Sequence, residues 1–459
     1  MYITEGLTVH FLVMGSLLAF IALQLRHHHL FHWRSAGFWA WSAIALYFFI
    51  TPLIQQLNDP YYLETRLAVT EGLWRMVWIT ACVAVGTAVF FLAYFNTKPG
   101  HPNFGLPQET WPRGAWIVII LGLVGAAYSL GTYRGVMGVG DTAQVTIQGG
   151  KFVGDTMGYT TVMHTFASFP IVMLLVRRST RVLGLAILGF YLAGRLEDAH
   201  DRASAVSLLL AISIISTYRR KRPWPAAWLV AGAVAFTLLV HARGHQSLSS
   251  FLEEGHGGQA LKISREEVGR GEGASMLASF YIKSYLHDKA GYTYGVPVVS
   301  GMLFGALPRK YFPWKDWMVE AYSHRDLADS YGSDMLYGSK SSVIGDLYGA
   351  GGMIGIFLGM PLVGFLTRKL DGFLSPQAPV AVRILGSVWL GSYWLMFGSS
   401  LTWAFGGVYL TGIPFIALVL ISRFLSPKTV RAKNLHPSLK QPGFGPVKEI
   451  AHAPGSDVR

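Results

Sequence analysis

The segment AAWLVAGAVAFTLLVHARGH, residues 226–245, contains the sharpest change of composition in the chain. Its first part, residues 226–242, contains no Lys, Arg, Asp or Glu and approaches the ~20 apolar residues that cross a hydrocarbon core as a helix. From Arg243 to Ser342 the chain is mostly polar, with 11 Lys or Arg and 11 Asp or Glu residues. We therefore predict that a membrane helix ends here and that one long loop begins.

The chain on both sides of this loop has the composition of a membrane protein. Hydrophobic residues make up 52% of the 459 residues and charged residues 14%, whereas soluble domains contain about 25% charged residues. We expect an all-α polytopic integral membrane protein with about 11 transmembrane helices and one long extracytoplasmic loop. The predicted spans are residues 7–25, 36–54, 72–95, 115–132, 159–176, 182–194, 203–217, 226–242, 343–366, 380–397 and 401–422.

These spans divide the chain into four parts. We expect an N-terminal transmembrane bundle of about eight spans in residues 1–242 and an extracytoplasmic loop with short helices in residues 243–342. Residues 343–425 hold about three C-terminal spans. Residues 426–459 form a cytoplasmic tail that is rich in Pro, Gly and basic residues, a composition typical of disorder. The first span has no basic region before it and no cleavage site after it, so we interpret it as a retained helix.

Basic residues gather in the connections of one face of the predicted bundle. These connections and the C-terminal tail hold 21 Lys or Arg and 4 Asp or Glu residues, whereas the rest of the chain holds 17 and 21. Because basic loops stay in the cytoplasm, we expect the N-terminus to lie outside and the C-terminus in the cytoplasm. The basic positions are Arg26, Arg34, Lys98, Arg113, Arg177, Arg178, Arg181, Arg219, Arg220, Lys221, Arg222, Arg368, Lys369, Arg383 and the tail from Arg423 onward.

The same topology explains the net charge of +13. Anionic lipids attract basic residues to the cytoplasmic surface, so membrane lipids are the expected partners and a nucleic-acid partner is not expected. The histidines of residues 27–29 and His32 share one basic connection, where contact with lipid headgroups and a metal site both stay open. The single cysteine, Cys82, lies inside an apolar span. This position argues against enzymes that use a thiol nucleophile at the membrane surface.

A second group of arginines lies at the opposite ends of the predicted spans, where the orientation does not require basic residues. A guanidinium group binds phosphate oxygens through two parallel hydrogen bonds and keeps its charge at physiological pH. Local ion pairs, such as Arg195 with Glu197 or Arg325 with Asp326, are the alternative reading. Arg75 lies inside the third span. The outer arginines are Arg134, Arg195, Arg202, Arg243, Arg309 and Arg325.

Histidines near these arginines are candidates for a general base. His245 and His324 each lie within two residues of an arginine, and the pKa of histidine lies close to neutrality. His241 and His245 are spaced as zinc ligands on a helix, but the HExxH pattern of zinc enzymes is not present. His164 lies within the fifth span, where an ionisable residue lines a functional cavity or forms a packing hydrogen bond. The carboxylates that stay open as alternatives are Glu197, Asp198, Asp201 and Asp346.

The end of the long loop resembles a known family. Residues 341–348, SSVIGDLY, are followed by glycines at 352, 355 and 359 and preceded by LPR at 307–309 and FPWK at 312–315. This pattern and the layout of spans resemble the Wzy-type oligosaccharide repeat-unit polymerases of O-antigen and exopolysaccharide assembly, with Asp346 where glutamate is usual. The glycine spacing also fits one small-residue helix face that allows close packing.

The resemblance implies a glycosyltransferase of the bacterial inner membrane that joins polyisoprenyl-pyrophosphate-linked oligosaccharides. It also implies a chain-length regulator and a flippase as further partners. It implies no metal and no cofactor. An O-antigen ligase, a transporter of lipid-linked glycan or solute, and a structural membrane subunit are the alternatives. In the catalytic assignment Arg202 and Arg243 act on the pyrophosphate with His245 or His324 as base, and the substrate-binding residues are Arg134, Arg195, Arg309, Arg325 and Tyr348.

Overall fold

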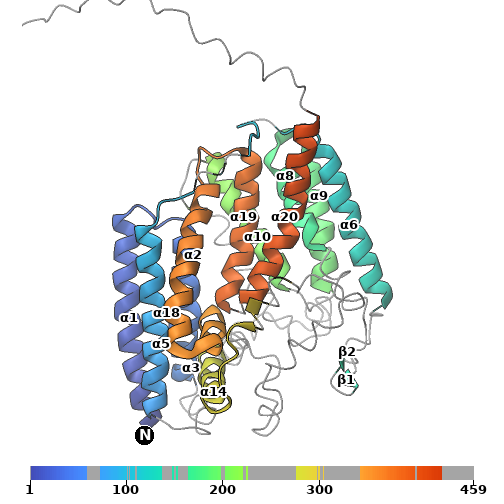
Figure 1. The fold of residues 1–459 in the computed structure, drawn as a ribbon. Coiled ribbons are helices and arrows are strands. Elements are labelled where there is room, and N and C mark those ends of the chain that lie inside the picture. The colour runs from blue at the N-terminus through green and yellow to red at the C-terminus, as the bar shows by residue number, and fades with distance from the viewer. Residues whose placement is uncertain are drawn as a thin grey trace, which may run out of the picture.

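The protein is described by a computed structural model, in which most of the predicted spans are visible as helices (Figure 1). The structure describes residues 2–58, 73–100, 102, 104–108, 111–136, 147–148, 151–152, 164–197, 202–220, 224–225, 275–296, 298–299, 303, 342–398 and 401–425. All structural statements below concern these residues.

The described N-terminal residues form long helices. A π-helical turn at Leu46–Ile50 joins α2 to α3, and these three pieces follow one another without a break. The elements are α1 (Tyr2–His27), α2 (Ala36–Ala45), α3 (Thr51–Asn58), α5 (Leu73–Asn96), α6 (Ala115–Val136) and a two-residue hairpin of β1 (Ile147–Gln148) and β2 (Lys151–Phe152).

The remaining elements are also helical. A 3₁₀ turn at His164–Ala167 leads into α8, and the C-terminal helices follow the long loop. They are α8 (Ser168–Val176), α9 (Arg181–Glu197), α10 (Arg202–Arg220), α14 (Ser275–Ala290), α18 (Ser342–Phe373), α19 (Val380–Gly398) and α20 (Leu401–Phe424).

Four described helical segments are long and apolar enough to cross a membrane, so the chain is an α-helical membrane protein. They are Glu5–His27, Ala36–Leu57, Trp74–Asn96 and Ser342–Phe373, and shorter apolar helices occupy Ala115–Tyr128, Val206–Tyr218 and Thr411–Phe424. Every predicted span except residues 226–242 contains a described helix, whereas residues 226–242 lie outside the described part of the chain. The number of membrane crossings and the long loop stay predictions.

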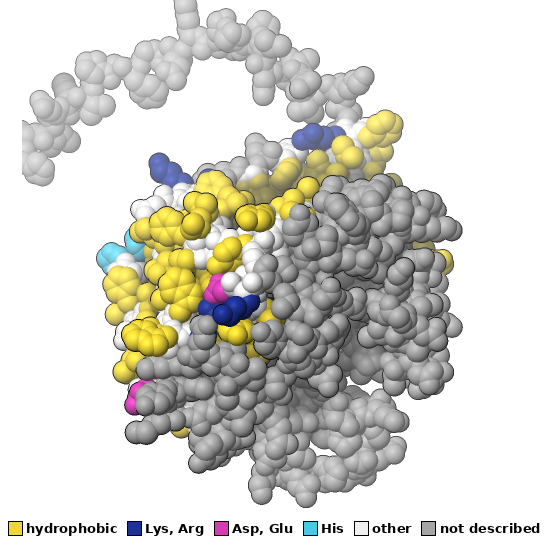
Figure 2. Space-filling view, turned by 60° about the horizontal axis from the view of Figure 1, so that its bottom comes forward, with side chains coloured by type: hydrophobic (Ala, Val, Ile, Leu, Met, Phe, Trp, Pro, Cys, Tyr) yellow, Lys and Arg dark blue, Asp and Glu magenta, His cyan; other side chains and the backbone are white. Residues whose placement is uncertain are grey.

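The helices pack side by side with small residues at their closest contacts. Helix α18 runs along α5 (Figure 1), and a Cβ on Gly364 of α18 would lie 2.3 Å from the carbonyl oxygen of Phe90 in α5. Glycine therefore permits this contact, as is common between membrane helices. In the face shown in Figure 2, large hydrophobic side chains cover much of the described part. The side chains of Phe190 and Ile354 are 81% and 72% exposed. Exposed side chains of this kind suit a lipid environment.

Helix α18 bends sharply where a continuous helix was expected. The backbone leaves the helical conformation at Gly351 and Gly352, and Gly352 has φ +63°. The glycines of this helix therefore do not form one straight packing face, and that interpretation is wrong. Gly359 instead packs on Leu347 of the same helix, because a Cβ on Gly359 would lie only 2.4 Å from the Leu347 side chain. The bend brings the two halves of α18 together.

Basic residues gather at one end of the bundle. Helices α1, α5, α18 and α20 finish at one end of the bundle, which we call the basic end. Helices α5 and α18 begin at the opposite end, where α14 also lies, and we call this the loop end (Figure 1). The described helices place the basic connections together at the basic end, an arrangement that the predicted orientation requires. These residues are Arg26, Arg34, Lys98, Arg113, Arg177, Arg178, Arg181, Arg368, Lys369 and Arg423.

Candidate functional site

A cluster at the loop end surrounds the carboxylate of Asp288 in α14. Arg75 of α5 donates to this carboxylate in an ion pair, and the hydroxyl of Tyr348 in α18 lies 2.8 Å and 3.0 Å from its two oxygens. The Tyr292 hydroxyl donates to the same carboxylate at 2.8 Å, and Trp78 Nε1 donates to the Tyr348 hydroxyl at 3.0 Å. We call these five residues the Asp288 cluster. It joins α5, α14 and α18.

The charges of this cluster explain why an arginine is tolerated in an apolar helix. The Arg75 side chain is 7% exposed, whereas that of Asp288 is 27% exposed. A charge removed from water requires a partner of opposite sign. Burial and the nearby Asp288 carboxylate raise the pKa of Tyr292, so its phenol stays protonated and donates. The Arg75 guanidinium also lies 5.4 Å from the centroid of the Tyr285 ring in α14, within the range of a cation–π contact.

The bend of α18 lies beside this cluster and receives the segment that follows α14. The backbone nitrogen and the side-chain hydroxyl of Thr293 both donate to the carbonyl oxygen of Gly349, each at 2.9 Å. A Cβ on Gly352 would lie 2.8 Å from the Tyr292 hydroxyl. The loop end of α18 is therefore shaped around the loop segment, and glycine provides both the turn and the space.

The carboxylate of Asp346 has a structural role. Its Oδ2 accepts a hydrogen bond of 2.7 Å from the backbone nitrogen of Leu401, the first residue of α20. A carboxylate at a helix N-terminus satisfies a backbone donor and suits the helix dipole. Burial lowers the pKa of Lys283 in α14, and the charge of Asp346 acts in the opposite direction. Asp346 therefore stabilises the start of α20.

The structure describes some of the predicted site residues. Tyr348 is brought into the Asp288 cluster and is 1% exposed. The backbones of Arg134, Arg195 and Arg202 lie in the last turn of α6, the last turn of α9 and at the start of α10, which all face the loop end (Figure 1). Their side chains are outside the described part. The predicted residues that lie wholly outside the described residues are Arg243, His245, Arg309, His324 and Arg325.

Sequence reasoning missed Trp78, Asp288 and Tyr292. Arg75 was noted as a charge within a span, and such a charge requires a partner. The partner comes from a helix more than two hundred positions away, and several carboxylates in the long loop would have satisfied the same requirement. The spacing of residues in the sequence therefore does not predict that Arg75 pairs with Asp288.

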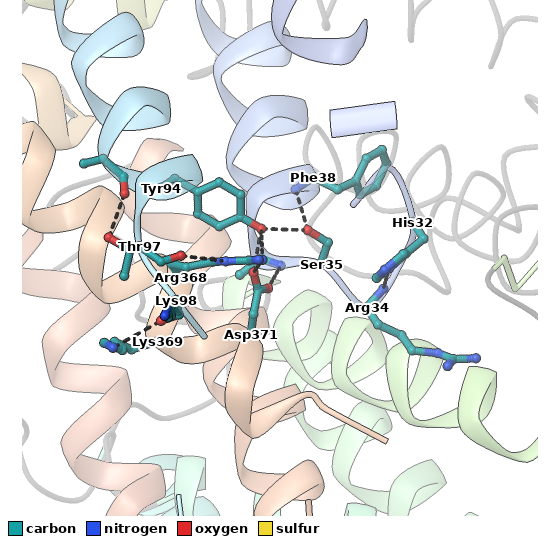
Figure 3. A network of polar contacts seen from close by, with 12 residues as sticks. His32, Arg34, Ser35, Phe38, Tyr94, Thr97, Lys98, Arg368, Lys369 and Asp371 are labelled. Atoms are coloured by element: carbon teal, nitrogen blue, oxygen red, sulfur yellow. Dashed lines mark hydrogen bonds and ion pairs between the residues drawn. The ribbon is translucent and has the colours of Figure 1, made fainter. Parts of the chain in front are cut away.

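A second polar cluster lies at the basic end and surrounds Asp371 of α18 (Figure 3). Its carboxylate accepts hydrogen bonds from the Tyr94 hydroxyl at 2.5 Å, the Ala36 backbone nitrogen at 2.7 Å and Arg368 Nη1 at 2.8 Å. The Ser35 hydroxyl lies 3.1 Å from the Tyr94 hydroxyl and also caps α2. These bonds tie α2, α5 and α18 together, and the side chain of Asp371 is only 9% exposed.

A cavity of about 290 Å³ opens beside this second cluster. Its ionisable lining residues are His32, Arg34, Arg368 and Asp371, and the turn after α18, with Ser375, completes the lining. Burial and the neighbouring Arg34 lower the pKa of His32. The Arg34 backbone nitrogen donates to His32 Nδ1 at 3.2 Å, so the neutral ring carries its proton on Nε2. The cavity therefore offers donors and positive charge.

The histidines before this cavity form ring contacts. His27 and His28 pack edge to face, and the His28 ring stacks on Phe95 at 5.1 Å between centroids. Within the described ranges no group of three or more His, Cys, Asp or Glu side chains could hold a metal ion. These contacts favour a role for the histidines at the membrane surface.

Comparison with known proteins assigns no family to the chain. No protein-family model matches it, and no curated protein and no solved structure is significantly similar to it. The function is therefore argued from the two ends of the bundle and from the residues placed there.

Proposed function

We propose that the chain is a membrane glycosyltransferase that polymerises polyisoprenyl-pyrophosphate-linked oligosaccharide repeat units at the outer leaflet. One observation carries the proposal: the helix ends that bear Arg134, Arg195 and Arg202 lie at the loop end, together with the Asp288 cluster (Figure 1). Arginines from distant parts of the chain are thereby brought to one end of the bundle. The resemblance of residues 341–348 to the polymerase family agrees with this placement.

The proposed reaction transfers a glycan between two lipid-linked substrates. A sugar hydroxyl of the incoming unit attacks the anomeric carbon of the growing chain, and the bond from that carbon to the pyrophosphate oxygen breaks. The hydroxyl proton passes to His245 or His324, and the departing lipid pyrophosphate takes the bonding electrons. Arg202 and Arg243, supported by Arg195, hold the charge that develops on this leaving group. Because guanidinium groups supply this charge, the proposal requires no metal or cofactor.

The Asp288 cluster has a positioning role in this proposal. Arg75 and Asp288 neutralise each other, so the cluster itself offers no excess charge to a pyrophosphate. Tyr348 is buried, and its hydroxyl is engaged by Asp288 and Trp78. Tyr348 therefore supports the surface on which substrate binds. The cluster holds α14 of the long loop against the membrane helices.

The polymerase proposal is tested with membranes that contain the full chain and purified lipid-linked repeat units. We expect ladders of glycan that become longer with time, and we expect R202A and R243A to abolish them while the folded protein stays in the membrane. R423A removes an arginine from the basic end and serves as the matched control, with normal ladders expected. Normal chain lengths from both R202A and R243A would overturn the proposal.

The same experiment separates the alternatives. An O-antigen ligase would give no ladder until lipid A core is added as acceptor. A transporter of lipid-linked glycan would move substrate without forming glycosidic bonds. Arg75 and Asp371 lie near the ends of their helices, and this placement favours chemistry at a membrane surface. A chain-length regulator and a flippase remain proposed partners.

A further inference from the structure

The cavity at the basic end lies at the opposite end of the bundle from the proposed catalytic site. Its volume of about 290 Å³ is close to the lower limit of small-molecule sites, about 300 Å³. The proposed glycosyl transfer uses none of its lining residues. Figure 3 shows the hydrogen bonds and ion pairs around Asp371, with His32 and Arg34 drawn beside them.

The lining carries an excess of positive charge. The Asp371 carboxylate is satisfied by three donors within the protein. Arg368 uses Nη1 for Asp371 and Nε for the Thr97 carbonyl oxygen, and its Nη2 has no hydrogen-bond partner among the described residues. Arg34 adds a second arginine to the lining, which contains two arginines and one carboxylate. Lys369, whose Nζ lies 3.1 Å from the Lys98 carbonyl oxygen, adds charge beside the cavity. This excess suits an anion.

The positive groups are held in place before any ligand binds. Arg34 donates from Nε to the Thr217 hydroxyl at 2.9 Å and from Nη2 to the Thr217 carbonyl oxygen at 3.0 Å. Its guanidinium lies 4.7 Å from the centroid of the Tyr218 ring. The neutral His32 ring offers an Nε2–H donor on the same wall. A site that is organised in advance loses little conformational entropy when it binds.

Aromatic residues place the cavity at the level of lipid headgroups. Phe31, Phe38 and four tryptophans form a connected set of ring contacts that begins close to it in the chain, with Trp33 and Trp39 at 4.3 Å between centroids. Tryptophan gathers at the boundary between hydrocarbon and water. One turn from Lys369 along α18, Phe365 is exposed, and Leu362 is exposed further from the basic end. The exposed face of α18 therefore offers an apolar surface to an acyl chain that extends from the cavity toward the middle of the membrane.

We propose that this cavity binds the phosphate headgroup of an anionic phospholipid from the leaflet at the basic end. The phosphate oxygens accept hydrogen bonds from the guanidinium groups of Arg34 and Arg368 and from His32. The acyl chains lie against the exposed face of α18. This inference is independent of the proposed glycosyl transfer.

The experiment uses the full chain in micelles of an uncharged detergent. Dihexanoyl phosphatidylglycerol, dihexanoyl phosphatidylcholine and inorganic phosphate are titrated separately, and binding is followed by native mass spectrometry and by the melting temperature. S375W fills the cavity without changing its charge, R34Q removes one charge, and R423Q removes an arginine from the same end outside the cavity. We expect phosphatidylglycerol to bind and both cavity variants to weaken it by about tenfold or more, with R423Q unchanged.

Three results would overturn the proposal. Equal binding of phosphatidylcholine would show that the negative charge is not recognised. A loss in R423Q as large as in R34Q would show general attraction to a basic surface. Binding of inorganic phosphate as tight as that of phosphatidylglycerol would assign the cavity to a soluble phosphate compound. If R34Q does not fold, the S375W variant provides the test. Unchanged binding of phosphatidylglycerol by S375W would exclude the cavity as the binding site.

Discussion

Removal of the two partners of the Arg75–Asp288 ion pair is expected to have unequal effects. The Arg75 side chain is 7% exposed and that of Asp288 is 27% exposed. D288A leaves a buried guanidinium without its carboxylate and removes the acceptor of the Tyr348 hydroxyl. Breaking a buried pair in this way lowers the free energy of unfolding by about 3–5 kcal/mol. Because Asp288 is partly exposed, we expect a loss of about 3 kcal/mol. R75L leaves a carboxylate that water can reach, so the loss is about 1 kcal/mol.

The double variant tests whether this asymmetry comes from the stranded charge. R75L/D288A carries neither charge, so we expect it to be about 1–2 kcal/mol more stable than D288A. The assay is unfolding of the full chain in mixed micelles, followed by tryptophan fluorescence with increasing denaturing detergent. K289A, which removes an exposed charge from the next position of α14, is the control and should change little. A double variant no more stable than D288A, or an R75L variant as unstable as D288A, would refute the reasoning.

Three further changes follow from the described contacts. G352A should destabilise the fold by about 1–3 kcal/mol because φ of +63° is unfavourable for alanine, whereas G351A has open space and should change the melting temperature little. D371N should lower stability by about 2–3 kcal/mol because Arg368 loses its charged partner in a mostly buried site; a melting temperature equal to that of the unmodified protein would contradict this. Because the pKa of His32 is lowered from its ordinary value of 6.5, the unfolded chain takes up the proton first, and stability should be full above this pH and fall as the pH decreases below it. Comparison of melting temperatures between pH 8 and pH 5 in the protein and in H32Q checks this, and an equal pH dependence in both would exclude His32 as the cause.

The apolar segments and the glycines illustrate what the sequence predicts well. Ala36–Leu57 and Trp74–Asn96 were expected as helices because hydropathy is a property of each segment by itself, and a helix in lipid satisfies its own backbone hydrogen bonds. The basic connections were likewise expected at one end of the bundle, since charge in loops sets orientation. The bend at Gly352 was not expected, because a glycine-rich apolar segment is compatible with both a straight and a broken helix.

The candidate sites depend on pairings that the sequence alone did not determine. Arg75 required a partner, but only the packing of α14 on α5 and α18 selected Asp288 and brought Tyr348 to it. Asp371 belongs to no motif in the sequence, and only the structure shows it joining Tyr94 to the start of α2. Composition and local pattern determined the helices and the membrane, since these depend on neighbours along the chain. The tertiary structure decided which charges meet, because that depends on how distant helices pack.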